Sequence, residues 1–122
     1  MNRRRSHRLN TNMPVEYRVV LHEQERQFSN RSTMKNISEG GTYLECDSRP
    51  GFILGQVGYF TLKSIGYTKE FGAIHLAANV IVRRMHHTEA GEVNFGFAVE
   101  FLSGPMIFFD NPYHGGHQPR GQ

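Results

Sequence analysis

Four arginines lie within the first eight residues, in the stretch NRRRSHRLN: Arg3, Arg4, Arg5 and Arg8. A guanidinium group keeps its charge in proteins, so a domain core cannot hold four of them in so short a span. Taken alone, the stretch fits a solvated basic terminus, or a non-specific contact with nucleic acid or an acidic membrane. It also fits a site for a smaller anionic ligand.

A second group of polar residues lies in MKNISEGG, where Asn36 and Ser38 stand two residues apart. On an extended backbone both side chains project to the same side. We expect Gly40 and Gly41 to permit positive φ and a close approach of a ligand to the backbone. This polar ledge suits a ligand rich in donors and acceptors, such as a nucleotide. The same pattern also describes an ordinary turn capped by Asn or Ser side chains.

The elements that must position these residues are predicted by alternation of apolar and polar residues, which indicates strands with one buried face. The clearest runs are MPVEYRVVLH, AIHLAANVIV and EVNFGFAVEF, and shorter ones are GTYLEC, VGYFTLK and the weaker FSNRSTMKNI. Five or six strands without a convincing amphipathic helix predict an all-β barrel or sandwich. After Leu102 the pattern stops, and we expect at most a short helical turn around Ile107 and Phe108 before a flexible tail.

Length and charge narrow the class of protein. The chain has 122 residues, which suits one domain. Eight basic and three acidic residues precede position 36, so that segment carries +5 and the remainder −2 of the total +3. The basic end therefore calls for an anionic partner.

Cys46 is the single cysteine and excludes an intramolecular disulfide. No apolar run approaches roughly 20 residues and no signal-peptide core follows the arginines, so we expect a cytoplasmic protein without membrane insertion.

Two short motifs resemble those of a known family. RRSHR, from Arg4 to Arg8, is an Arg-x-x-x-Arg element, and NISEGG, from Asn36 to Gly41, is an Asn-x-Ser-x-x-Gly element. This pair, in this order, resembles the cyclic di-GMP-binding signature of the PilZ family. The late run GFAVEFL is similar to the closing strand of that family's barrel, and ANVIVRR to its penultimate strand. The resemblance covers about residues 4–102 and implies a small antiparallel six-stranded β-barrel.

The resemblance also implies ligand contacts. Both arginines of the first motif contact the dinucleotide in the family, which here are Arg4 and Arg8, with Arg3 and Arg5 as supporting charge. A guanidinium fork binds a phosphate or the O6 and N7 edge of guanine, and its face stacks on a base. The polar residues of the second motif, here Asn36 and Ser38, bind a guanine edge and the ribose-phosphate backbone.

The glycines of the second motif, Gly40 and Gly41, complete the expected site, with Gly41 fixing the turn. The family often has Asp where this chain has Asn36. The neutral amide brings no negative charge to the guanine N1–H and N2–H₂ donors, so we expect the affinity for the dinucleotide to differ from that of family members with Asp.

The resemblance implies a PilZ domain over residues 1–103, with a basic ligand-binding arm at 1–9, a barrel at 10–103 and a tail at 104–122 that is a short helix or flexible. Ordering about six arm residues costs on the order of 6–12 kcal/mol. We therefore expect the arm to be mobile without ligand, and to order over the barrel through charged hydrogen bonds worth about 1.5–3 kcal/mol each. The altered surface would then act on a downstream protein in motility, exopolysaccharide production or virulence.

Two other classes of function stay open. A PilZ-like adaptor would bind proteins with little nucleotide affinity, although an intact Arg4, Arg8, Asn36 and Ser38 argues against it. A nucleic-acid-binding barrel would need exposed aromatics, whereas here they fall mainly on the predicted core faces. We expect a monomer or weak dimer and no enzyme, because no Ser-His-Asp order or close carboxylate pair stands out.

The remaining candidate residues have simpler interpretations. His114 and His117 lack further Cys or acidic ligands, so no metal and no cofactor beyond the dinucleotide ligand is expected. His86 and His87 are predicted in a hairpin loop. The neighbouring pair, Arg83 and Arg84, either reaches a ligand phosphate or faces water, and water is favoured.

Overall fold

The computed structural model describes residues 8–23, 26–66, 72–88 and 95–110. These residues form seven strands and no helix: β1 (Leu9–Leu21), β2 (Gln27–Ile37), β3 (Gly41–Cys46), β4 (Val57–Ser64), β5 (Ala73–His87), β6 (Phe95–Phe101) and β7 (Met106–Asp110). Within the described ranges, no helix is present that is long and apolar enough to cross a membrane. The predicted arginines Arg3, Arg4 and Arg5, and the tail histidines His114 and His117, lie outside the described residues.

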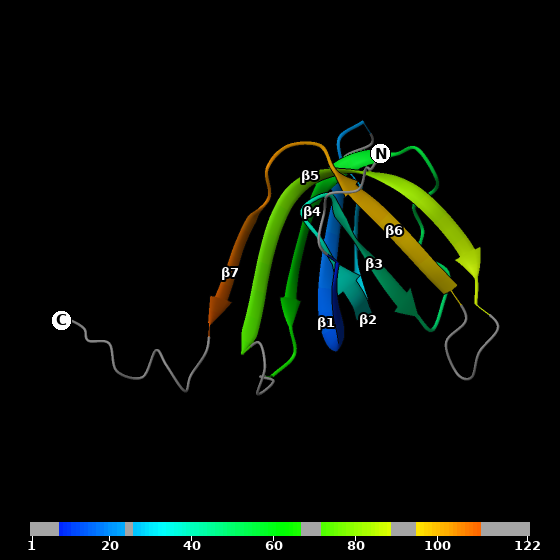
Figure 1. Ribbon diagram of the computed structural model, residues 1–122. Helices are drawn as coiled ribbons and strands as arrows, with labels where there is room; N and C mark the ends of the chain where they lie inside the picture. Colours follow the sequence, from blue (N-terminus) through cyan, green and yellow to red (C-terminus); the bar gives the residue numbers. More distant parts are fainter. Residues whose placement is uncertain (1–7, 24–25, 67–71, 89–94, 111–122) are drawn as a thin grey trace, which may run out of the picture.

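Six strands close into an antiparallel barrel in the order β4-β1-β2-β3-β6-β5 (Figure 1). The pairing of β4 with β5 closes the barrel and extends from Val57↔Ile81 to Lys63↔His75. Closure of this kind removes the free edges that an open sheet would expose. The predicted all-β, six-stranded antiparallel barrel is therefore confirmed.

The core consists of the inward-facing side chains that the alternation predicts. On β1 the buried residues include Val15, Tyr17, Val19 and Leu21, with Met13 before them; on β5 they include Ile74, Leu76, Ala78, Val80 and Val82; and on β6 Phe95, Phe97, Val99 and Phe101. The loop before β4 adds Phe52, which is fully buried and meets the rings of Tyr17, Phe28 and Phe97 edge-on at 5.0 to 6.3 Å. Burial of aromatic rings in this geometry dominates the stability of so small a core.

β5 is the longest strand, with 15 residues, and it organises one side of the molecule. Its second half pairs with β6, from Val80↔Phe101 to His87↔Phe95. The prediction of a hairpin loop at His86 and His87 is therefore wrong, because both residues belong to the ladder. The outward-facing polar positions there gave no apolar alternation from which to extend the strand.

The tail prediction also needs correction. Residues 106–110 form β7 rather than a helical turn, and β7 pairs with the first half of β5, from Ala77↔Met106 to Ala73↔Asp110. β6 leaves that part of the β5 edge without a partner, so a second strand satisfies backbone groups that would otherwise lack hydrogen bonds. Ile107 packs against the core at the same time. The long-range pairing decides the conformation, and no local signal in the tail announces it.

Candidate ligand-binding site

The link from β2 to β3 is a tight turn built by Ser38. Its backbone N–H donates to the Gly41 carbonyl at 2.9 Å, and its hydroxyl accepts from the Gly40 N–H at 3.2 Å. The Thr42 hydroxyl donates to the Asn36 carbonyl at 2.7 Å. Ser38 therefore caps the turn. Within the described part of the chain, the half-buried Asn36 side chain makes no hydrogen bond, so its amide is available to a ligand.

Gly41 is required by crowding against β6. A Cβ at this position would overlap the Val99 carbonyl oxygen and stand 3.2 Å from the Val99 carbonyl carbon and 3.3 Å from the Glu100 Cα. The expectation of positive φ is wrong: neither Gly40 nor Gly41 is among the glycines with positive φ. The glycine keeps β3 close to β6, and the turn therefore lies directly on the barrel wall.

The strand pairing brings the first motif to the second. Leu9 and Asn10 at the start of β1 pair with Ile37 and Asn36 of β2. Arg8, one residue before Leu9, therefore stands beside the Ser38 turn. A bulge between Asn10 and Met13 permits this pairing, and it includes Asn12 with φ of 49°. Asparagine tolerates this left-handed conformation better than most residues.

A bulge in β5 supplies a second wall of the site. Val82 pairs with Val99 and Arg84 with Ala98, so Arg83 is the extra residue. As a result the two consecutive arginines, Arg83 and Arg84, are both exposed on the outer face. Arg83 forms an ion pair with Glu100 of β6. The bulge thus directs two guanidinium groups to one face, where a regular strand would present one.

Between these walls lies a cluster of hydrogen-bonded side chains. The Tyr43 hydroxyl stands 3.3 Å from Glu45 Oε2 and 3.0 Å from His86 Nε2, and the Tyr43 and His86 rings are 10° from parallel. Gly96 leaves room for this arrangement, because a Cβ there would overlap the Tyr43 hydroxyl. Burial raises the pKa of the Tyr43 phenol, and the Glu45 carboxylate raises it further. Tyr43 therefore stays protonated and remains a donor.

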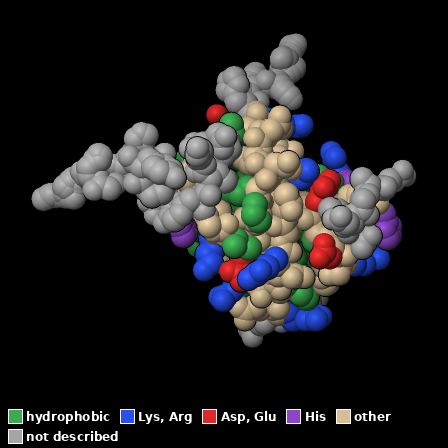
Figure 2. Space-filling view, turned by 90° about the horizontal axis from the view of Figure 1, so that it is seen from below, with side chains coloured by type: hydrophobic (Ala, Val, Ile, Leu, Met, Phe, Trp, Pro, Cys, Tyr) green, Lys and Arg blue, Asp and Glu red, His purple; other side chains and the backbone are tan. Residues whose placement is uncertain are grey.

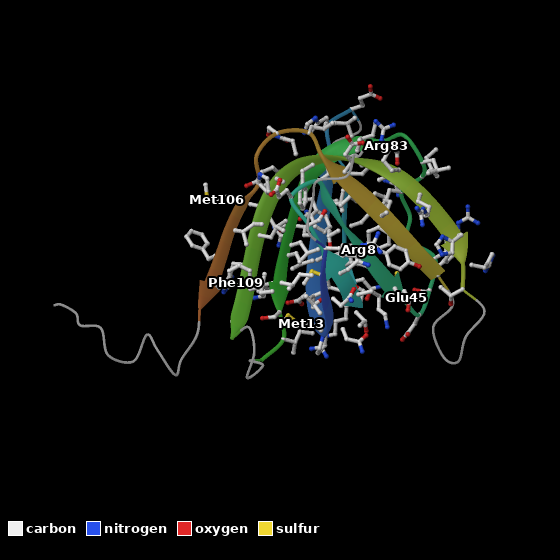
Figure 3. The ribbon with its side chains drawn as sticks, in the orientation of Figure 1. Arg8, Met13, Glu45, Arg83, Met106 and Phe109 are labelled. Carbon is white, nitrogen blue, oxygen red and sulfur yellow. The ribbon has the colours of Figure 1, made fainter. Side chains whose placement is uncertain are left out.

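These elements surround one hollow on the outer wall of the barrel, with a volume of about 430 Å³. The size is within the range of roughly 300–1,000 Å³ that small-molecule sites show. Five of the seven residues predicted from the sequence line it, namely Arg8, Asn36, Ser38, Gly40 and Gly41. The other two, Arg4 and Arg5, lie outside the described residues. Figure 3 shows Arg8 between the levels of Arg83 and Glu45 on this side of the barrel.

The electrostatics of the hollow favour an anion. Three arginines line the hollow: Arg8, Arg83 and Arg84. Among the described residues, Arg83 forms an ion pair with Glu100, whereas Arg8 and Arg84 form no ion pair. Two guanidinium groups without a carboxylate partner can each grip a phosphate or a purine edge. Hydrogen-bonding groups of Asn36 and Tyr43 lie beside them. The hollow can therefore bind a ligand that combines negative charge with base edges.

Sequence reasoning missed Tyr43, His86 and Glu100 as lining residues, and for Arg83 and Arg84 it favoured water over a ligand phosphate. The signal that bears on Arg83, Arg84 and His86 is ANVIVRRMHH, where these residues follow an alternating run. Two consecutive arginines that end a buried alternation cannot both face the core, and a bulge is one way to expose both. The interpretation that they face water describes their exposure and overlooks the hollow.

Comparison with known proteins identifies the family. A family model for the PilZ domain matches residues 2–107, so this chain belongs to the PilZ domain family. Among solved structures, it is similar to the Bacillus subtilis inhibitor of motility (MotI/DgrA), with a TM-score of 0.55 and 19% identity over 85% of this chain. The chain spans 44% of the length of that protein, and at this identity the likeness shows the fold. A search of curated proteins found no match.

Proposed function

We propose that this protein is a receptor for cyclic di-GMP and acts by binding rather than by catalysis. The observation that supports this most is the meeting of two motifs at one hollow: Arg8 from the start of β1 stands beside the Ser38 turn between β2 and β3. Membership of the PilZ family supports the same ligand. The solved structure that it resembles is described as an inhibitor of motility, which is consistent with a signalling role.

The proposed ligand matches the chemistry of the hollow group by group. Its two phosphates take the guanidinium groups of Arg8 and Arg84, which have no ion-pair partner among the described residues. The Asn36 amide faces a guanine edge, and the exposed Gly40 lets the ligand approach the backbone. Arg4 and Arg5 close over the ligand from the N-terminal arm. Ordering of that arm changes the surface offered to a downstream protein.

A nucleic-acid-binding barrel is not favoured by the surface. Nucleic-acid sites of this fold size combine exposed aromatics with a basic groove. Here Tyr17, Phe52, Phe60 and Phe97 are buried in the core. The exposed aromatics Tyr59, Phe108 and Phe109 do not line the hollow that holds the arginines. On the face in Figure 2, Lys and Arg side chains lie among Asp and Glu rather than in one basic band.

Calorimetric titration with cyclic di-GMP tests the proposal, with separate titrations of GTP and cyclic di-AMP as controls. Arg8→Ala removes charged hydrogen bonds worth about 1.5–3 kcal/mol, so affinity should fall roughly 10- to 150-fold. Arg31→Ala is the matched control, because Arg31 is exposed on β2 and does not line the hollow. Equal heats for all three nucleotides, or equal losses for both variants, would contradict a specific site.

Arm ordering needs a separate measurement. Backbone ¹⁵N relaxation of residues 4–8 should show slower local motion with cyclic di-GMP than without it. If cyclic di-GMP binds and the relaxation of residues 4–8 is unchanged, the protein is still a receptor, but the hypothesis that the arm becomes ordered is wrong. Absence of binding, with unchanged amide shifts at Asn36 and Ser38, would instead favour an adaptor that recognises proteins alone.

A further inference from the structure

The outer edge of β7 is an exposed strand edge. β7 stands last in the sheet order and pairs with β5, and among the described residues no other strand pairs with it. Met106, Phe108 and Phe109 are 62%, 58% and 52% exposed. Three large exposed apolar side chains on a five-residue strand form a cluster, whereas apolar residues exposed singly are ordinary on a protein surface. Figure 3 shows Met106 and Phe109 on β7, away from Arg8, Glu45 and Arg83.

Apart from its short length and its terminal Asp110, this edge carries few of the features that normally block pairing with another chain. Natural edge strands use Lys, Pro, inward charges or bulges for that purpose. The strand MIFFD has no Lys, Pro or Gly, and its register with β5 is unbroken. Its one charged residue, Asp110, is the last residue of the strand. Within the part of the chain that the structure describes, the edge is therefore open to a further strand.

We propose that β7 pairs with β7 of a second copy of this chain, antiparallel about a two-fold axis, so that the two barrels share one continuous sheet. An isologous pairing of this kind is self-complementary by symmetry. In such a pair, opposite residues project to the same face, so their numbers must have equal parity. The register that pairs all five residues is centred on Phe108.

That register is chemically self-consistent. Phe108 faces Phe108 of the second copy, an aromatic cross-strand pair, and Ile107 faces Phe109 on the other side. Met106 faces Asp110, which places the two Asp110 residues at opposite ends of the ladder. No like charges oppose each other, and every central pair is apolar. A second copy thus covers the exposed side chains that β7 presents.

The surroundings favour a second copy over a charged partner. Met106 and Phe108 border a hollow of about 440 Å³ on the outer face. Of the charged residues that line it, Lys63 and Glu16 stand 3.9 Å apart and offset each other, and Arg18 is the remaining charge. A five-residue ladder alone covers less than the roughly 1,200–2,000 Å² of a standard stable interface. The dimer is therefore weak and depends on concentration.

Cysteine cross-linking tests the register. With Phe108→Cys, the two introduced thiols face each other with Cα atoms about 4.5–5.5 Å apart, within the range for a disulfide. With Met106→Cys, equally exposed on the same strand, the two thiols are four residues out of register, about 13 Å apart. The native Cys46 is buried, which raises the pKa of its thiol to about 11, so it stays protonated at pH 8. Mild oxidation should yield a covalent dimer with Phe108→Cys and at least tenfold less with Met106→Cys.

Sedimentation of the unmodified full chain provides the second measurement. The wild type should show a monomer–dimer equilibrium, and Phe108→Lys, which puts two like charges face to face, should weaken it at least tenfold. Leu54→Lys is the matched control, since Leu54 is 56% exposed in the loop before β4. A wild type that stays monomeric at all concentrations, or equal cross-linking at positions 106 and 108, would overturn the proposal. Phe108→Lys should bind cyclic di-GMP with the affinity of the wild type. A failure of the dimer proposal can therefore be distinguished from a failure of the receptor proposal.

Discussion

Gly41 offers the sharpest test of how the turn and the barrel wall are joined. An Ala side chain here would overlap the backbone carbonyl of Val99 on β6, and Gly41 pairs with Glu100 in the same ladder. The obstructing atoms belong to the backbone, so no side chain can rotate away. β3 and β6 would have to separate locally at the point where the β2–β3 turn is attached.

The expected cost has two parts. Inserting a methyl group into a well-packed region typically costs about 1–3 kcal/mol. Separation of the strands also stretches the bond from the Phe101 N–H of β6 to the Gly40 carbonyl, 2.8 Å. Each such bond contributes about 0.5–1.5 kcal/mol. Together Gly41→Ala should destabilise the fold by about 1.5–4.5 kcal/mol, which lowers Tm by roughly 5 °C or more.

Gly104→Ala is the matched control for this substitution. A Cβ at Gly104 meets no atom within 4 Å, and its φ is not positive. Replacing such a glycine reduces the entropy of the unfolded chain, so it should leave stability unchanged or raise it by up to about 1 kcal/mol. Urea unfolding of both variants at equal protein concentration gives the comparison. If Gly41→Ala matched Gly104→Ala within about 0.5 kcal/mol, the crowding argument would be refuted.

Two further predictions concern Tyr43 and the buried thiol. Gly96→Ala should displace the Tyr43 side chain from His86. The free energy of unfolding should then fall by only about 1 kcal/mol, whereas the affinity for cyclic di-GMP should change more. Urea unfolding and calorimetry measure these two effects, and an unchanged affinity would exclude Tyr43 from the site. Burial, followed by the charges of Asp47 and Glu45, raises the pKa of Cys46 from 9.0 to about 11. Its stabilising effect is therefore complete below pH 9 and is lost as pH rises from 9 to 11, because the unfolded chain ionises first. Urea unfolding from pH 8 to 10.5 should show this decline, and Cys46→Ala should lessen it; an equal decline would exclude the thiol as its cause.

Much of the barrel could be predicted from the sequence because its strands have one buried face and one solvent-exposed face. On β1, Val15 and Tyr17 point inward and Glu16 and Arg18 outward, and this alternation is visible without any knowledge of partners. The pattern failed where burial no longer alternates. β5 continues to His87 through polar residues, and β7 exists because the β5 edge is open there. Pairing between distant segments determines these parts, and a single segment carries no sign of it.

The candidate site divides in the same way. The residues of one local turn, Asn36 to Gly41, were found because their spacing is a motif, although the reason for Gly41 proved to be steric rather than conformational. Arg83 and Arg84 were set aside because their contribution depends on a bulge in β5 and on the neighbouring β6. A motif reports what one loop can offer, whereas the opposite wall of a hollow depends on which strand the barrel places next to it.

Barrel closure explains why the two motifs and the second wall meet at all. The sheet order places β2, β3, β6 and β5 side by side, so one row across the outer face reads Asn36, Tyr43, Ala98 and Arg84. The small Ala98 at the centre of that row leaves the hollow open between the amide and the guanidinium group. Since β1 pairs with β2 and Asn10 lies opposite Asn36, Arg8 lies two residues beyond that row, beside the Ser38 turn. Arg8 can therefore line this hollow only if the strand order is kept. Substitutions that loosen the β2–β3–β6 ladder should weaken ligand binding even where they touch no ligand-contacting side chain.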